Sequence, residues 1–212
     1  MINELLTATL ETLYMTFISG LIAVIVGLPL GIALYILSKS DKKISKITYG
    51  ILDAIVNIIR SIPFIILIIL LIPLAKLLIG TIIGPNYAIV SLSIAAIPFM
   101  ARLSENSFNN LTSGLWDTSI SMGLTNSQFI TKILIPETAA ETISNITLML
   151  INLITYTAIA GTVGAGGLGS MAINYGYQRF RADVLFADVI ILIILTQIIQ
   201  IAGTKISNSL RK

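Results

Sequence analysis

The chain has 212 residues, of which 56% are hydrophobic and only 11% charged, whereas a typical soluble domain carries about 25% charged residues. Its formal charge of +3 is small, and it contains neither cysteine nor histidine, which excludes disulfides, thiolate nucleophiles and metal sites built on cysteine or histidine. Uncharged runs cover Thr12–Ser38, Leu77–Ala101 and Thr142–Gln178, and a membrane-crossing helix needs roughly 20 apolar residues. We therefore predict an all-α polytopic membrane protein with five transmembrane helices and a single domain, residues 1–212.

The first span is predicted at about Leu13–Leu37. Before it, Glu4 and Glu11 lie two helical turns apart, which indicates either a short amphipathic lead-in or a frayed terminus. Small residues let helix backbones approach closely in lipid, so packing is the favoured role of three glycines in this span: Gly20, Gly27 and Gly31.

The second span follows a lysine-rich loop, Lys39–Lys46, which the positive-inside rule places in the cytoplasm. Three polar residues then share one helix face: Asp53, Asn57 and Arg60. Because a charge at the bilayer centre is costly, we predict a helix over Ile47–Arg60 in or near the cytoplasmic interface, a bend at Pro63, and a membrane crossing from there to about Leu74. The alternative is that this polar face lines a water-filled path.

The third span is predicted at about Tyr87–Met100, after an external loop that holds the turn-forming Gly80, Gly84 and Pro85. This span is short and contains Pro98, so it should tilt or break near Arg102.

The fourth span is predicted at about Ile143–Val163, and the fifth at about Val184–Ala202. Three polar residues keep to one face of the fourth span, where they either bond to other helices or line a passage: Asn145, Asn152 and Tyr156. The glycine-rich stretch Gly164–Gly169 should form an external loop. Positive residues gather in the predicted inner segments, which places the N-terminus outside and the C-terminus inside: Lys39, Lys42, Lys43, Lys46, Arg102, Lys132, Lys205, Arg211 and Lys212.

One polar stretch, Asp117–Pro136, interrupts the apolar chain, and we call it the polar island. Serine, threonine, asparagine and glutamine are spread through it, Gly123 sits near its middle and Pro136 stops its second half. This pattern predicts a short helix, a turn from Gly123 to Asn126 and a second short helix on the cytoplasmic side. A pair of short polar helices at a membrane surface is suited to binding a soluble partner.

No phosphate-binding G-x-x-x-x-G-K-[ST] loop is present, and no carboxylates are paired at a spacing that suggests hydrolysis. The glycines of Gly164–Gly169 follow a membrane span and lack the strand-then-helix context of a nucleotide site. The sequence therefore predicts a protein that is not an enzyme and binds no cofactor or metal.

The polar island resembles the EAA loop of ABC importer permeases, whose pattern is E-A-A-x3-G-x9-I-x-L-P. Gly123, Ile133 and Pro136 fall in register with that pattern. Its first three positions are occupied by Asp117, Thr118 and Ser119, which keep the acid and the small size, and Ile135 replaces the leucine. The resemblance implies that these residues couple the membrane helices to a cytoplasmic ATPase.

The chain also resembles the methionine-importer subfamily of these permeases over nearly its whole length. The likeness is carried by GLPLGIALY, AIVNIIRSIPFIIL, GTIIG, AIPFMAR, VGAGGLG and YGY, which begin at Gly27, Ala54, Gly80, Ala96, Val163 and Tyr175.

This resemblance implies a homodimer in the bacterial cytoplasmic membrane, with two ABC ATPase subunits that hydrolyse ATP, an extracytoplasmic methionine-binding protein or lipoprotein, and no nucleic acid. The candidate pathway and gate residues are Asn57, Arg60, Asn152, Tyr156 and Ile159. Another amino acid or a betaine stays open as the solute. An ion-coupled secondary transporter is less favoured, because the spans hold few ionisable residues.

Overall fold

The computed structural model describes residues 2–111 and 113–211, and every regular element in this part of the chain is helical. Four helices are each long and apolar enough to cross a membrane: α1 (Ile2–Lys39), α5 (Pro85–Asn109), α9 (Ala139–Gly161) and α11 (Ala182–Leu210). A fifth candidate, α2 (Lys43–Ser61) with α3 (Phe64–Leu70), is bent by 104°. The predicted all-α polytopic fold is confirmed, and the predicted second span corresponds to the bent pair of α2 and α3. Lys212 lies outside the described residues.

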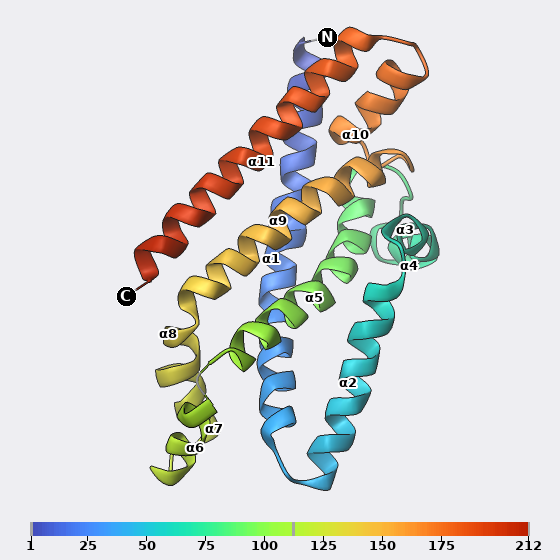
Figure 1. Ribbon diagram of the computed structural model, residues 1–212. Helices are drawn as coiled ribbons and strands as arrows, with labels where there is room; N and C mark the ends of the chain where they lie inside the picture. The colour runs from blue at the N-terminus through green and yellow to red at the C-terminus, as the bar shows by residue number, and fades with distance from the viewer. Residues whose placement is uncertain (1, 112, 212) are drawn as a thin grey trace.

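Helix α1 is the centre of the bundle and packs against both α5 and α9 (Figure 1). A side chain at Gly27 would put its Cβ 2.7 Å from the carbonyl oxygen of Ile97 on α5, and one at Gly31 would meet Ala101 at the same distance. These glycines are therefore packing residues, as predicted. The 38 residues of α1 span about 57 Å, so the predicted lead-in is the first part of the same helix.

Helix α2 contains the predicted helix Ile47–Arg60 and is longer at both ends, and the interfacial placement of that helix stays a prediction. Its 19 residues extend over about 28 Å, and it runs beside α1 and α5 (Figure 1). Exposed isoleucines form a stripe along its outer face: Ile44, Ile47, Ile51, Ile55 and Ile58. The charge of Asp53 is neutralised by Arg102 of α5, which lies far away in the sequence, so Asp53 by itself does not require α2 to lie at the interface.

The bend at Pro63 is confirmed, because α2 ends at Ser61 and α3 begins at Phe64. Helix α3 has seven residues, about 10 Å, so the predicted crossing after the bend is wrong. Helix α4 (Ile72–Ile79) follows and ends at Gly80, whose φ is 82°. Together α3 and α4 lie across the ends of α2 and α5 (Figure 1).

Helix α5 continues through Pro98 to Asn109, so the predicted break near Arg102 is wrong. Proline is tolerated inside a membrane helix when neighbouring helices support it. Here Pro98 is buried, and Met100 and Ala101 after it are fully buried as well.

The polar island forms α6 (Ser113–Ser121), α7 (Asn126–Phe129), a π-helical turn η1 (Ile130–Leu134) and α8 (Ile135–Glu137). The predicted helix–turn–helix is confirmed. Helical conformation passes through Pro136 and changes only at Thr138, so Pro136 does not stop the second half. The island projects from the end of the bundle that also carries the α1–α2 loop, opposite the N-terminus (Figure 1).

The first part of the glycine-rich stretch Gly164–Gly169 forms a turn, as predicted, but its last three residues begin a helix. This helix is α10 (Gly167–Met171), and the π-helical segment η2 (Ala172–Tyr177) follows it. The Glu11 carboxylate accepts a hydrogen bond from the Gly167 N–H at 2.7 Å, which ties α10 to α1. A further bond, from the Gly84 N–H to the Gly164 oxygen at 2.9 Å, joins the two loops predicted to be external.

Candidate functional site

The turn of the polar island depends on Gly123. The Gly123 N–H donates to the Ile120 oxygen and the Leu124 N–H donates to the Ser119 oxygen, at 2.9 and 3.0 Å. These two bonds make a Schellman motif, in which the residue after the helix takes a left-handed conformation. Gly123 has a φ of 71°, and a Cβ at this position would meet no atom within 4 Å. The glycine is therefore required here by backbone conformation and not by close packing.

A capping box starts the second half of the island. The Gln128 N–H donates to the Thr125 hydroxyl, and the Thr125 N–H donates to the Gln128 side-chain oxygen. This reciprocal pair fixes where α7 begins. The spacing T-x-x-Q in the sequence predicts a helix that begins after Thr125, a signal that sequence reasoning did not include.

An aromatic cluster holds the island against the membrane helices. Trp116 of α6 and Phe129 of α7 meet edge to face, with ring centroids 5.0 Å apart. Tyr35 of α1 lies 6.1 Å from Trp116, 6.4 Å from Phe129 and 5.9 Å from Phe108 of α5. These rings come from four helices, so the cluster packs the island against α1 and α5.

The tip of the island is open to solvent. Asp117, Thr118, Gly123 and Pro136 are exposed and Ile133 is half-buried, whereas Ser119 is buried and its hydroxyl donates to the Trp116 oxygen at 2.6 Å. Beside the turn, Ile120 and Met122 expose 59% and 71% of their surface. An exposed pair of apolar residues at a rigid polar tip is suited to docking into a cleft of another protein.

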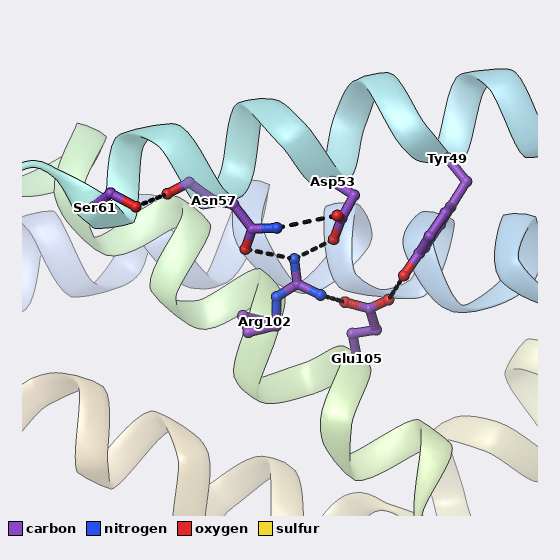
Figure 2. Close-up of polar contacts among 6 residues, drawn as sticks. All are labelled: Tyr49, Asp53, Asn57, Ser61, Arg102 and Glu105. Carbon is purple, nitrogen blue, oxygen red and sulfur yellow. Dashed lines mark hydrogen bonds and ion pairs between the residues drawn. The ribbon is translucent and has the colours of Figure 1, made fainter.

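Figure 2 shows an ionic network between α2 and α5. Arg102 donates to Asp53, to the Asn57 side-chain oxygen at 3.0 Å and to Glu105 at 2.6 Å. The Tyr49 hydroxyl donates to the other Glu105 oxygen at 3.1 Å. The network joins the two helices. Two of the three residues of the polar face predicted on α2, Asp53 and Asn57, take part in it.

Arg60, the last residue of that face, lies apart from the network. Its guanidinium carbon is 6.0 Å from the centre of the Phe99 ring. Tyr156 of α9 stacks on Phe64 of α3, with centroids 4.4 Å apart and ring planes 6° apart. These four side chains line a cavity of about 170 Å³, so the structure brings the predicted pathway residues Arg60 and Tyr156 together.

The remaining polar residues of α9 differ in their surroundings. The Asn145 amide donates to the Leu103 oxygen and to the Ser107 hydroxyl of α5, at 3.2 and 2.7 Å, so interhelix bonding explains it. Asn152 is half-buried. Ile159 is half-buried and packs against the main core cluster, and it is not among the residues that line the Arg60 cavity.

Comparison with known proteins gives a family match over residues 23–212, to the model of binding-protein-dependent transport system inner membrane components. The methionine import system permease protein MetP of Bacillus subtilis is 46% identical, over 100% of this chain and 95% of its own. A probable D-methionine transport system permease protein MetI of Vibrio cholerae is 44% identical, over 94% of this chain and 88% of its own.

Solved structures agree with this match. A chain of the MetNI methionine ABC transporter in an inward-facing conformation aligns with a TM-score of 0.95 and 40% identity, covering 100% of this chain and 98% of its own. An amino acid ABC transporter with histidines aligns with a TM-score of 0.78 at 17% identity, covering 98% of this chain and 94% of its own. The second likeness concerns the fold alone.

Proposed function

The chain belongs to the family of binding-protein-dependent transport system inner membrane components, and we propose that it is the permease subunit of an ATP-driven importer for methionine. The observation that carries this proposal is the 46% identity to a methionine import permease over the whole chain. The names of the relatives favour methionine over the other amino acid or the betaine that the sequence left open. Residues 1–212 then act as one permease domain.

We infer the partners from two features of the chain: it has no phosphate-binding loop for ATP, and its helices pack on one another. The helices of the single bundle pack on one another, and an isologous pair of such bundles can enclose a passage on its two-fold axis. We therefore assign a homodimer with two cytoplasmic ATPase subunits, which bind and hydrolyse the ATP. An extracytoplasmic methionine-binding protein or lipoprotein delivers the solute.

In the bacterial cytoplasmic membrane we place the N-terminus outside and the C-terminus inside. The lysines of Lys39–Lys46 support this orientation. The polar island lies at the same end of the bundle as that loop (Figure 1), which puts it where the ATPases would be.

The polar island is the proposed coupling element. Its tip docks into the ATPase, and the aromatic cluster around Tyr35 passes the ATPase's movement to α1 and α5. The residues assigned to coupling are those matching the family pattern: Asp117, Thr118, Ser119, Gly123, Ile133 and Pro136.

The proposed pathway lies along α2 and α9. Arg60, Asn152 and Tyr156 face it, with Ile159 as an apolar gate. Asn57 borders it from the ionic network, where Arg102 holds its side-chain oxygen.

Uptake of labelled methionine tests the solute. Cells that lack their own methionine importers, and express this permease with its ATPase and binding protein, should accumulate methionine. An excess of unlabelled methionine should abolish the uptake, and an excess of glycine betaine should not. Competition by betaine alone would overturn the methionine assignment.

Two substitutions at Gly123 test the coupling. Leucine is strained at a φ of 71°, whereas asparagine adopts the left-handed conformation more readily. Gly123→Leu should lower uptake and recovery of the ATPase with the solubilised permease, while Gly123→Asn should keep both near the original level. Normal transport by Gly123→Leu would remove the coupling role from this turn.

A further inference from the structure

Arg60 carries a charge that the fold leaves unneutralised. Among residues 2–111 and 113–211, no acidic side chain forms an ion pair with it, and its one specific contact is with the Phe99 ring. Arg102, by comparison, pairs with both Asp53 and Glu105. Arg60 is exposed on the single subunit near the end of α2, which together with α3 is long and apolar enough to be a broken span, and an ionisable residue there without a partner points to a ligand or an ion path.

The cavity beside Arg60 combines this cation with an apolar wall. Arg60 forms one side, and the stacked rings of Phe64 and Tyr156 line the cavity together with the apolar Leu67 and Ala95. Its volume of about 170 Å³ is below the 300–1,000 Å³ of typical pockets for drug-sized ligands. The volume of the cavity and the residues that line it suit one small solute that has a negative group at one end and an apolar body.

We propose that this cavity is a binding site for the transported amino acid inside the membrane, a proposal that rests on the function proposed above. The guanidinium of Arg60 binds the solute's carboxylate, because its planar fork matches a carboxylate bidentately. The unbranched thioether side chain lies along Phe64 and Tyr156, since sulfur packs well against aromatic rings.

The bend of α2 supplies the third element of the site. The last carbonyl groups of a helix lack intrahelical donors. At this end of α2, the capping bond runs from the Ile62 N–H to the Ile59 oxygen, and the chain then turns by 104° into α3. Ile59 and Ile62 at this helix end line the cavity, and we assign the solute's ammonium group to the unbonded carbonyl oxygens of the last turn of α2.

A cysteine reporter tests the site directly, because the chain has no cysteine of its own. Ala95→Cys places a thiol in the cavity wall, and Ile62→Cys provides a second reporter in the same cavity. The purified permease with its ATPase is treated with a thiol reagent, and the labelling rate is measured with increasing methionine or methioninamide. Methionine should slow the labelling, and methioninamide, which lacks the carboxylate, should protect much less.

Arg60→Gln should raise the half-protecting methionine concentration about 10- to 100-fold, as expected when a charge-assisted hydrogen bond is lost. The matched control is Arg179→Gln, which removes another arginine that lies over an aromatic ring, Tyr175, at 4.4 Å. It should leave protection unchanged. Unfolding temperatures of all variants show whether the fold is kept.

The outcomes separate this site from the proposed function. If the original protein imports methionine but Arg60→Gln is protected at the same concentration, the site is wrong and the function stands. Equal protection by methioninamide, or protection by an anionic lipid and not by methionine, would also overturn the site. If methionine is not imported at all, the function itself is wrong.

Discussion

Replacing Arg102 by methionine should destabilise the protein more than any exposed charge substitution. Glu105, its partner, exposes only 2% of its side chain, and Asp53 exposes 29%. Without Arg102, two carboxylates face each other between α2 and α5 with no cation. Removing one partner of a buried ion pair costs about 3–5 kcal/mol, which corresponds to a fall in unfolding temperature of roughly 6–20 °C for a chain of this size.

The assay is thermal unfolding of the purified protein in detergent. Lys46→Met is the matched control, because it removes the same charge from an exposed pair with Asp41, whose side chains are 62% and 103% exposed. Its unfolding temperature should stay within the error of the original protein.

A triple variant separates charge from packing. Arg102→Met combined with Asp53→Asn and Glu105→Gln leaves no unpaired charge, and the hydroxyl of Tyr49 can still donate to the new amide oxygen. Most of the lost stability should return. If Arg102→Met unfolds at the same temperature as Lys46→Met, the network does not hold α2 to α5.

Three further results are expected. Gly31→Leu should abolish recovery of a monodisperse protein, because even its Cβ would lie 2.7 Å from the Ala101 oxygen, a backbone atom; a well-folded variant would refute the close α1–α5 packing. With an impermeant thiol reagent on intact cells, Asn86→Cys should be labelled and Ser40→Cys should not, and the reverse pattern would invert the orientation. Ile159→Cys should crosslink between two subunits in the resting state, and failure to crosslink in an intact dimer would place the gate elsewhere.

Local signals in the sequence predicted much of the fold. The bend at Pro63 and the turn at Gly123 were visible because proline and glycine each restrict or permit a particular backbone conformation. The capping box of Thr125 and Gln128 was equally local, and it would have placed the start of α7. Each of these features depends on residues within a few positions of one another.

The errors came from contacts between distant positions. The charge of Asp53 favoured an interfacial α2, and the neutralisation of that charge by Arg102, 49 positions away, was not visible in the sequence. Helix α5 was expected to tilt or break near Arg102 because it contains Pro98, and the support that α1 gives to α5 was not visible in the sequence. The aromatic cluster that fixes the polar island joins Tyr35 to Phe129, and no spacing rule connects residues so far apart.

The most direct test of the account is ATP-driven transport by purified components. The permease dimer and its ATPase are reconstituted into liposomes, with ATP supplied to the compartment that the Lys39–Lys46 loop faces, which is identified by labelling Ser40→Cys. Labelled methionine, delivered with the binding protein on the opposite side, should accumulate in the ATP compartment and should not do so with a non-hydrolysable analogue. Accumulation without ATP hydrolysis, or no movement of methionine in an intact complex, would contradict the account.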